Sequence, residues 1–297
     1  MVNNNQSKFN HFDKTMITKA QIKQFHNNGV LHLKNVMDKQ QLALLRDIAD
    51  SLEKQALSRQ NKPLFDDSNI SLELFTPVLH RIKHIHRHAP LSLLALLTSD
   101  QLNHIKSVLC SEDALPTAEM MIFKQALSQA EIPWHQDFIE SSSANSIITI
   151  GIYLDDSQVG DGNVQFIPGT HNEKQDICRF IHGEKSLGEL TEFDVQAGDI
   201  IVHNPMVVHR SGLMQQHQKR RTLYYEFRTQ ENIQSQSSWP AEFLDVRKKL
   251  MAVAEQYVKE AALSVSNDEV NMYQYVVEEI FQVKTPPIPA NYCHIDR

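Results

Sequence analysis

Cysteine is scarce in this chain of 297 residues, which contains only Cys110, Cys178 and Cys293. Three scattered cysteines are too few for a disulfide framework, and their spacing does not form the CxxC pairs of a zinc site. We therefore interpret them as buried or idle thiols. Because an odd number of cysteines suits a reducing compartment, we expect a cytoplasmic protein.

Long apolar runs and long basic runs are also missing. No apolar stretch reaches the ~18 residues of a transmembrane helix, and the Asn-rich residues 1–10 lack the apolar core of a signal peptide. The 29 basic and 36 acidic residues give a formal charge of −7. We therefore expect no membrane partner, no nucleic-acid partner, and a small or mid-sized molecule as the substrate.

The patterns that are present predict one domain over residues 1–297 with three parts. A part with helices and a strand comes first, residues 18–115, and a β-rich core follows, residues 116–230. Helical patterns with a 3.6-residue period occupy residues 240–285. Short strands in succession imply a sandwich or a barrel, so we expect a mainly β fold with flanking helices.

Capping signals mark the start of two N-terminal helices. Thr18 and Gln21 form a capping box, as do Asp38 and Gln41. Between the two helices, residues 30–36 alternate apolar and polar side chains and predict a strand. The chain is therefore expected to open with a helix, a strand and a longer helix.

The β-rich core contains six short apolar runs separated by clusters of turn residues. They cover residues 120–127, 134–139, 147–154, 163–167, 200–208 and 220–228. In the run from 147 to 154 the even positions are apolar, whereas Thr149, Gly151 and Tyr153 occupy odd ones. Such a strand has one apolar face and one face that can line a cavity.

Polar segments lie between these patterns. We interpret residues 59–72 as a loop that overhangs a site, and residues 139–146 and 172–194 as loops that form a lid. Residues 230–238 are interpreted as a polar linker, and the irregular residues 286–297 receive no assignment.

A histidine-rich segment precedes the core. His80, His84 and His88 would form one stripe on a helix, and such a stripe can bind zinc. Basic residues interleave the stripe, and no carboxylate or cysteine completes it. We therefore favour a solvated helix face over a zinc site.

The strongest chemical signal is the stretch Trp-His-Gln-Asp-Phe, residues 134–138. On a strand, the period of two places His135 and Asp137 on one face, where they can bind one metal ion. A third candidate ligand, His209, lies in Val-Val-His-Arg-Ser-Gly. Two histidines and one carboxylate form the set that holds Fe(II) and leaves positions for a co-substrate and O2. By itself, the pair fits a surface strand with a salt-bridged aspartate equally well.

A basic pair downstream offers a partner for an acidic co-substrate. The far carboxylate of 2-oxoglutarate needs such a partner, and a guanidinium group can donate two parallel hydrogen bonds to it. Strand parity places Arg221 on an apolar face and Arg220 on a polar face, so we favour Arg220. Ser211 lies two residues after His209, on the same face if the strand continues, and its hydroxyl group can bind the same carboxylate.

Five motifs follow one another along the chain. They are Trp-His-Gln-Asp-Phe, Ile-Tyr-Leu-Asp-Asp, Gly-Asn-Val-Gln-Phe-Ile-Pro-Gly-Thr-His from 162 to 171, Val-Val-His-Arg-Ser-Gly, and Arg-Arg-Thr-Leu. This series resembles the phytanoyl-CoA hydroxylase family of Fe(II)/2-oxoglutarate dioxygenases. The opening helix, strand and helix also resemble that family, so the resemblance covers residues 18–230.

The resemblance implies a double-stranded β-helix, a jelly-roll barrel whose interior holds the metal. It carries iron ligation onto His135, Asp137 and His209, and 2-oxoglutarate binding onto Arg220, Ser211 and Met120. A basic residue near the segment 81–83 is a further candidate for the co-substrate. Gly151 stands where many relatives have a bulky aromatic side chain, so the wall beside the co-substrate is expected to differ here.

Two further histidines in these motifs receive a structural interpretation. Pro168 and Gly169 predict a tight turn, and His171 is expected to cap it or pack against it. His203 receives the same interpretation.

The resemblance also indicates the chemistry. Halogenating relatives lack the carboxylate that Asp137 supplies, so hydroxylation is expected: 2-oxoglutarate and O2 give succinate, CO2 and an oxidant that hydroxylates a C–H bond. Two other functions share the ligand pattern. One is a cupin-like protein that binds or senses metal without turnover, and the other is a nucleic-acid demethylase, which the acidic charge balance opposes.

Overall fold

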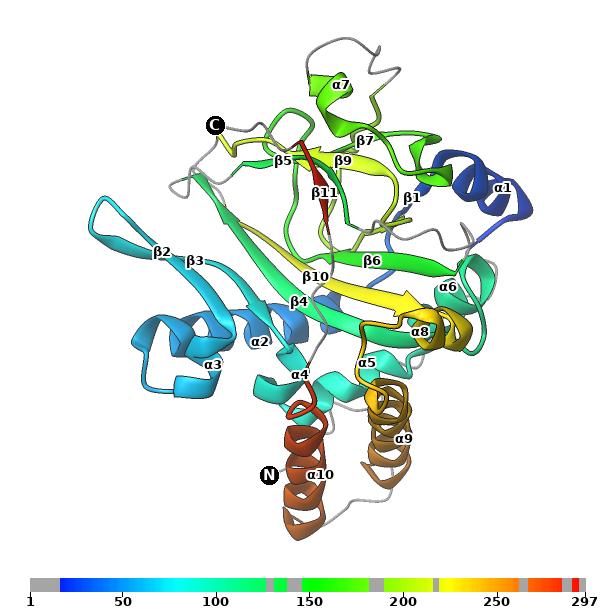
Figure 1. The fold of residues 1–297 in the computed structure, drawn as a ribbon. Coiled ribbons are helices and arrows are strands. Elements are labelled where there is room, and N and C mark those ends of the chain that lie inside the picture. The colour runs from blue at the N-terminus through cyan, green and yellow to red at the C-terminus, as the bar shows by residue number, and fades with distance from the viewer. Residues whose placement is uncertain are drawn as a thin grey trace.

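Two antiparallel sheets form the centre of the computed structural model (Figure 1), which describes residues 17–126, 131–137, 146–181, 190–215, 219–261, 267–284 and 290–293. The larger sheet has the strand order β1-β8-β6-β10-β4-β3-β2, and the smaller one has the order β11-β5-β9-β7. The strands are β1 (Val30–Leu33), β2 (Ser68–Glu73), β3 (Thr76–Lys83), β4 (Leu115–Gln125), β5 (Ile132–Gln136), β6 (Ile147–Tyr153), β7 (Val164–Ile167), β8 (Ile200–His203), β9 (Val208–Ser211), β10 (Lys219–Arg228) and β11 (Asn291–Tyr292).

From β4 onward, successive strands alternate between the two sheets. The even-numbered strands β4 to β10 belong to the larger sheet, and the odd-numbered strands β5 to β11 belong to the smaller one. This alternation winds the chain as a double-stranded β-helix, so the expected fold is confirmed. It also makes β5 and β9 direct neighbours, although they are far apart in the sequence.

Most helices pack on the outer side of the larger sheet and at its ends, whereas α7 lies beside β5 and β11 of the smaller sheet (Figure 1). They are α1 (Lys19–Asn28), α2 (Lys39–Ser58), α3 (Lys62–Asp66), α4 (Ile85–His88), η2 (Leu91–Leu93), α5 (Leu94–Leu97), α6 (Asp100–Leu109), η4 (Thr170–Asn172), α7 (Ile177–Ile181), α8 (Gln230–Ser235), α9 (Phe243–Ala261) and α10 (Asn267–Ile280). Both predicted capping boxes are present. The side chain of Thr18 accepts from the Gln21 backbone N–H, and that of Asp38 accepts from the Gln41 backbone N–H.

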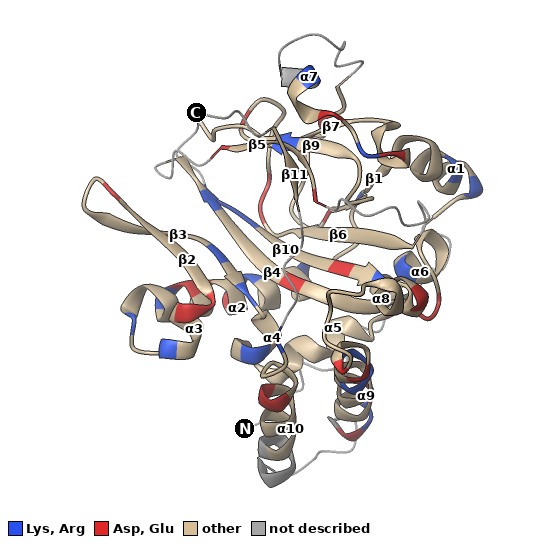
Figure 2. Cartoon of the chain, in the orientation of Figure 1, with Lys and Arg blue, Asp and Glu red and all other residues tan. Residues whose placement is uncertain are grey.

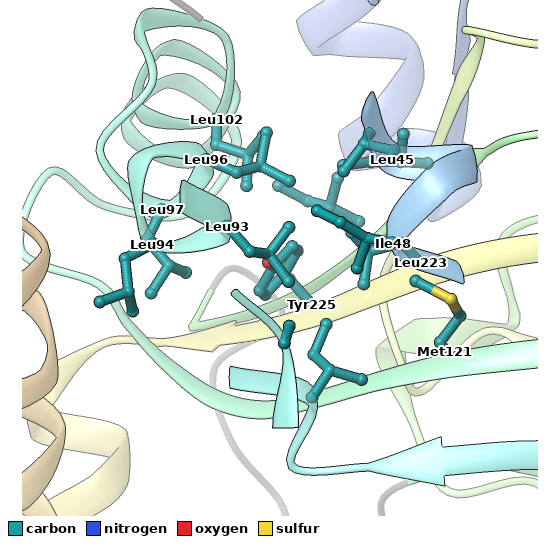
Figure 3. Close-up of a cluster of buried hydrophobic side chains, with 14 of the residues drawn as sticks. Leu45, Ile48, Leu93, Leu94, Leu96, Leu97, Leu102, Met121, Leu223 and Tyr225 are labelled. Atoms are coloured by element: carbon teal, nitrogen blue, oxygen red, sulfur yellow. The ribbon is translucent and has the colours of Figure 1, made fainter. Parts of the chain in front are cut away.

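The apolar face of the larger sheet forms the main core with the helices. The even-numbered residues Ile148, Ile150 and Ile152 of β6 are all fully buried in it, as their alternation predicts. Figure 3 shows Leu45 and Ile48 of α2 near Leu223 of β10 in this core. Because each fully buried Leu or Ile contributes roughly 1.5–3 kcal/mol, this face holds the helices on the sheet.

The opposite face of the larger sheet carries polar groups and faces the smaller sheet. Across the strands, Gly151 pairs with Tyr224, Tyr224 pairs with Met120, and Arg220 pairs with Lys124. Directly paired residues share one face, so these side chains form the inner wall of the β-helix. The odd-numbered residues of β6 therefore lie on this inner wall, where the Tyr224 ring fills the space beside Gly151.

The interpretation of residues 59–72 as a loop is wrong. The segment contains α3 and most of β2, which pairs with β3 in a hairpin. Pro63 lies in the first turn of α3, where a missing N–H leaves no hydrogen bond unmade, and the Asn61 side chain caps that turn.

Three smaller expectations also need correction. The predicted linker 230–238 contains the helix α8, capped by Thr229. The predicted strand 200–208 is split into β8 and β9 by a turn at 204–207, where the Val207 N–H donates to the Asn204 carbonyl. Residues 291–292, which received no assignment, form β11.

The structure contradicts the interpretation of all three cysteines as idle thiols. Cys178 of α7 and Cys293, the residue after β11, form a disulfide bond. They meet because β11 pairs with β5 beside α7, which no local pattern reveals. The odd cysteine count therefore no longer supports a reducing compartment. Cys110 remains a free thiol, and burial raises its pKa to about 12.

The histidine-rich segment is not one helical stripe. His80 lies on β3, and His84 adopts a left-handed conformation (φ 53°) just before α4. The expectation of a solvated face without a carboxylate is also wrong, because Asp67 binds two of the histidines. Its carboxylate oxygens lie 3.2 Å from His84 Nδ1 and 2.6 Å from His88 Nε2.

Acidic and basic residues are interspersed over the helices and sheets (Figure 2). None of the helices in the described part of the chain is both long and apolar enough to cross a membrane. Residues 138–145, which contain most of the first predicted lid loop, lie outside the described residues, as do residues 182–189 of the second loop and residues 1–16. In its described part, the second predicted loop contains the helix α7.

Candidate metal centre

His135, Asp137 and His209 come together between the sheets. Their ligand atoms all lie within 4.8 Å of one another, and this is the only such group of histidine, cysteine and acidic residues among those that the structure describes. His135 Nε2 lies 3.2 Å from Asp137 Oδ1, and His209 Nε2 lies 3.5 Å from Asp137 Oδ2. The three residues singled out by the sequence are therefore close enough to bind one ion.

Strand pairing explains why these residues meet. His135 of β5 pairs directly with His209 of β9, so both imidazoles leave the smaller sheet on one face. Gln136 points to the other face, where its amide donates to the Met206 carbonyl at 2.6 Å. Just past the end of β5, the Asp137 N–H donates to the Pro205 carbonyl at 2.8 Å, which holds the carboxylate beside the histidines.

Both imidazoles have the hydrogen bonds that a metal ligand needs. Nδ1 of His135 donates to the Pro133 carbonyl, and Nδ1 of His209 donates to the Val207 carbonyl, each at 2.8 Å. Since a carbonyl only accepts, these bonds fix the proton on Nδ1 and leave the Nε2 lone pair for a cation. Two imidazole nitrogens and one carboxylate oxygen fit ferrous iron.

The charges of the group are coupled. Burial pushes the pKa of Asp137 upward, but the imidazoles of His209 and His135 outweigh burial and hold it well below its ordinary value. Burial lowers the pKa of His135, whereas the hydrogen bond and charge of Asp137 raise it, and the net direction is upward. Asp137 is therefore a carboxylate near neutral pH, as cation binding requires.

Arg220 lies buried on the inner face of β10, as strand parity predicts. Its Nη1 donates to the Gly162 carbonyl at 2.9 Å and to Asn163 Oδ1 at 3.0 Å, and its Nε is a buried donor without a partner. Arg221 points to the outer side, where its guanidinium group binds Asp155. Of the two arginines, only Arg220 faces the interior.

Lys124 is a second buried cation beside Arg220, and the sequence reasoning missed it. It lies directly opposite Arg220 across the β4–β10 pair, and its ammonium group donates to Ser211 Oγ and to the Gly212 carbonyl. Burial, and next the charge of Arg220, lower its pKa to about 7. Its position four residues after Met120 on β4 was the available signal, since both then share one face.

This pair of cations forms no direct ion pair with a carboxylate among the described residues, although the charges of Glu131 and Asp161 act to raise the pKa of Lys124. Among the described residues, no carboxylate lies within 4.0 Å of the charged nitrogens of Lys124 or Arg220. Buried charges are normally paired, so two adjacent cations held only by neutral oxygens indicate a site for an anion. Ser211, two residues after His209 on β9, accepts a hydrogen bond from Lys124. The arrangement fits a carboxylate of 2-oxoglutarate.

The remaining candidates line the same wall. Met120 is on the inner face of β4, where Lys83 of β3 pairs with it. At Gly151 an added Cβ would lie 2.6 Å from the ring of Tyr224, so the phenol ring of the next strand fills the space that glycine leaves. The wall beside the expected co-substrate therefore contains an aromatic ring, but it comes from β10.

The structural interpretation of His171 agrees with its contacts. Its ring packs against Gly29, and its Nε2 donates to the His26 carbonyl at 3.1 Å. His203 lies outside the metal group, with its ring 5.1 Å from that of His209, and burial lowers its pKa to about 3. It is therefore a neutral packing residue next to the site.

Comparison with known families gives one match. The family model for phytanoyl-CoA dioxygenase (PhyH) matches residues 25–222, which include all three members of the metal group. No curated protein sequence matches the chain at a significant level.

Solved structures with a similar fold cover most of the chain. EvdMO1 is 26% identical, with a TM-score of 0.63, and the match covers 71% of this chain and 50% of EvdMO1. AviO1 from Streptomyces viridochromogenes Tue57 is 25% identical, with a TM-score of 0.61, and the match covers 73% of this chain and 96% of AviO1. EctD from S. alaskensis, solved with 2-oxoglutarate and 5-hydroxyectoine, is 16% identical over 76% of this chain and 82% of its own, with a TM-score of 0.61, and shows the likeness of fold.

Proposed function

The chain belongs to the phytanoyl-CoA dioxygenase family, and from this membership we propose that it hydroxylates a C–H bond of a small or mid-sized organic molecule. Members of this family are oxygenases that depend on non-haem iron and 2-oxoglutarate, and the chain is such an enzyme. The single observation that carries the proposal is the group of His135, Asp137 and His209. The full domain, residues 1–297, is proposed to act as one unit around it.

The metal ligands are proposed to be His135, Asp137 and His209. Each imidazole presents Nε2 because its Nδ1–H is bound to a backbone carbonyl, so the rings need not reorient when iron binds. Asp137 supplies the negative charge. Because this carboxylate occupies a ligand position, we propose hydroxylation and not halogenation.

Arg220, Lys124 and Ser211 are proposed to bind the far carboxylate of 2-oxoglutarate. The two cations stand side by side on β10 and β4, and the Ser211 hydroxyl bonds to Lys124. A buried carboxylate between them would balance two charges that form no direct ion pair among the described residues. Met120 is proposed to pack against the carbon chain of the co-substrate from the same strand as Lys124.

Iron and 2-oxoglutarate, when bound, activate O2 and give succinate and CO2 as co-products. The residues of this chain hold iron and 2-oxoglutarate next to each other, because the metal group and the cation pair lie on facing sheets. Tyr224 and Met120 lie on the same inner wall as the cation pair. The protein thereby directs the oxidant to the bound substrate.

The first experiment measures metal and co-substrate binding without O2. Fe(II) and 2-oxoglutarate together should give a weak visible charge-transfer band with the wild type and no band with Asp137→Ala. Asp176→Ala, which removes an exposed acid outside the group, serves as the matched control and should keep the band. A folded wild type without the band contradicts the assignment.

The second experiment tests hydroxylation. A library of small organic molecules is screened for succinate release, and each product is weighed by mass spectrometry for the gain of one oxygen atom. Release that depends on a substrate and is abolished in Asp137→Ala supports hydroxylation. Tight metal binding without decarboxylation of 2-oxoglutarate would instead indicate a protein that binds or senses metal.

A further inference from the structure

The short strand β11 places an aromatic ring against the metal group. Tyr292 pairs directly with His135, and the two rings stack with centroids 4.9 Å apart and planes 12° apart. The other neighbour of the His135 ring is His209, with centroids 4.1 Å apart. The imidazole of His135 therefore contacts two rings. One of them, Tyr292, belongs to a segment that is distant from the β-rich core in sequence.

Tyr292 also lies near the charged groups of the interior. Burial raises the pKa of its phenol, and among charges Asp137 raises it while Arg81 lowers it. Arg81 stands on the inner face of β3, opposite Ile122. The ring of Tyr292 is thus within electrostatic range of both Asp137 and Arg81.

Among the described residues, two hydrogen bonds from the side chain of Asn291 add to the pairing of β11 with β5. Asn291 Nδ2 donates to Gln136 Oε1 at 3.0 Å and to the Gln175 carbonyl at 2.8 Å. A strand of two residues forms too few ladder bonds to stay in place by itself. The covalent link is the Cys178–Cys293 disulfide, one residue after Tyr292.

Cys178 of this disulfide borders the surface of the protein. A surface pocket of about 360 Å³ is lined by residues of the α7 segment, including Cys178, and by Asn291 and Tyr292. On its other side, Cys293 packs against the apolar cluster that contains Trp134, the residue before His135. The bond therefore connects a solvent-accessible pocket to the strand that carries the metal group.

We propose that Tyr292 is a positioning residue for His135, and that the Cys178–Cys293 disulfide keeps it there, so that reduction of this bond weakens metal binding. This role depends on the proposed function, in which His135 binds iron. A dithiol opens the bond by thiol–disulfide exchange. Its two thiols become a disulfide, two electrons pass to the protein, and Cys178 and Cys293 each become a thiol.

The experiment measures Co(II) affinity of the full chain by titration of the cobalt absorption bands. The oxidised wild type is compared with wild type that has been reduced by dithiothreitol, desalted and kept anaerobic. Reduction should weaken Co(II) binding by about tenfold, a typical result of losing a contact that orients a ligand. Cys293→Ser should bind as weakly without reductant, whereas Cys110→Ser, which leaves the bond intact, should match the oxidised wild type.

Two variants of Tyr292 separate positioning from a general structural role. Tyr292→Ala removes the stacked ring and should weaken Co(II) binding and alter the cobalt bands. Tyr292→Phe keeps the ring and should restore both. The Trp134 emission, read in a Trp239→Phe background, should shift to longer wavelength on reduction because Cys293 leaves its cluster.

The outcomes distinguish this inference from the proposed function. A wild type that binds no Co(II) in either state overturns both. Equal Co(II) binding before and after reduction, with normal binding by Tyr292→Ala, overturns only the role of β11. Loss in Tyr292→Phe equal to that in Tyr292→Ala also contradicts it, since the stacked ring would then have no part.

Discussion

Two positively charged side chains lie side by side inside this protein. Their repulsion raises the free energy of the folded state unless an anion binds beside them. Lys124 and Arg220 face each other across paired strands and donate to neutral oxygens. Lys124 loses its proton before Arg220 does, because the pKa of Lys124 is lowered to about 7, whereas a guanidinium group keeps its proton. An anion bound beside Lys124 would therefore favour its protonated form.

This arrangement predicts a pH dependence of 2-oxoglutarate binding. Above pH about 7 the free Lys124 loses its proton and its attraction for a carboxylate, so the dissociation constant should rise with pH between about 7 and 9. Calorimetric titration in the presence of Mn(II) in place of iron measures it. Lys124→Met should bind 2-oxoglutarate about tenfold more weakly at pH 6.5 and show a flat profile, and Lys34→Met, an exposed control, should behave as the wild type.

The same shift has a defined sign for stability. The folded pKa of Lys124, about 7, lies below its ordinary value of 10.5, so the unfolded chain binds more protons between these values. Lys124 therefore makes unfolding less favourable as pH rises from about 7 to 10.5. For the binding prediction, a pH profile of 2-oxoglutarate affinity that is the same in the wild type and in Lys124→Met would contradict the place of Lys124 in the site.

The face on which a residue lies could be predicted from local spacing in the sequence. The residue that lies opposite it on another strand could not. His135 and Asp137 are two apart on a strand, and Arg220 differs from Arg221 by parity alone. Lys124 shares a face with Met120 by local spacing, but its place opposite Arg220, like that of Tyr292 opposite His135, depends on pairing with another strand. That partner depends on long-range pairing, which no local pattern contains.

At the scale of elements, the helix α9 is attached to the sheet by a buried ion pair. Arg247 Nη1 donates to Glu119 Oε2 of β4 at 2.9 Å, and both side chains are almost fully buried. Phe243 and Phe281 pack against the guanidinium group, with its carbon 5.0 and 5.4 Å from their ring centroids. The packing of α9 on the sheet therefore buries the positive charge of Arg247, and Glu119 of β4 pairs with it.

Loss of one partner of this pair is predicted to be strongly destabilising. Arg247→Met leaves the Glu119 carboxylate buried and unpaired, so the free energy of unfolding should fall by about 3–5 kcal/mol. Urea denaturation followed by circular dichroism measures the change. Lys249→Met, on the same helix, breaks the exposed pair with Glu279 and should cost less than about 1 kcal/mol. A similar small loss for both variants would show that the buried pair contributes little.

Elements with standard end signals were predictable, whereas those with unusual ends were not. The first two helices begin with the capping boxes that their sequences indicate. The hairpin of β2 and β3 turns through Leu74 and Phe75, which have φ values of 48° and 67°. Turns of this kind normally use Asn or Gly, because other side chains are strained at positive φ, so no local signal marks the hairpin, and the polar composition and Pro63 of residues 59–72 favour a loop instead.

At the scale of the whole molecule, one apolar cluster joins the three parts of the chain. It includes Phe25 of α1, Ile150 of β6, Leu250 of α9 and Phe281, which follows α10. The alternation of strands between the sheets then brings β5 and β9 together, so the metal group exists only when the β-helix is complete. Composition and strand spacing indicate this fold class, but the pairing that closes the site is a property of the assembled sheets.

This continuity predicts that the chain unfolds as one cooperative unit. The two tryptophans are suitable probes, because Trp134 lies in the smaller sheet and Trp239 packs against Phe243 at the start of α9, with ring centroids 4.9 Å apart. Trp134→Phe leaves only the second probe, and Trp239→Phe leaves only the first. In each single-tryptophan variant, urea unfolding followed by fluorescence should coincide with unfolding followed by circular dichroism.

The alternative is a C-terminal helical part, residues 240–285, that unfolds by itself. Trp239 would then report a transition at lower urea than Trp134, and circular dichroism would show two steps. The buried Arg247–Glu119 pair opposes this behaviour, since opening α9 alone would leave Glu119 without its partner inside the fold. Addition of Mn(II) with 2-oxoglutarate should therefore move both fluorescence transitions to higher urea together, although the ligands bind far from Trp239. A shift confined to Trp134 would show that the helices and the metal-binding sheets are separate cooperative units.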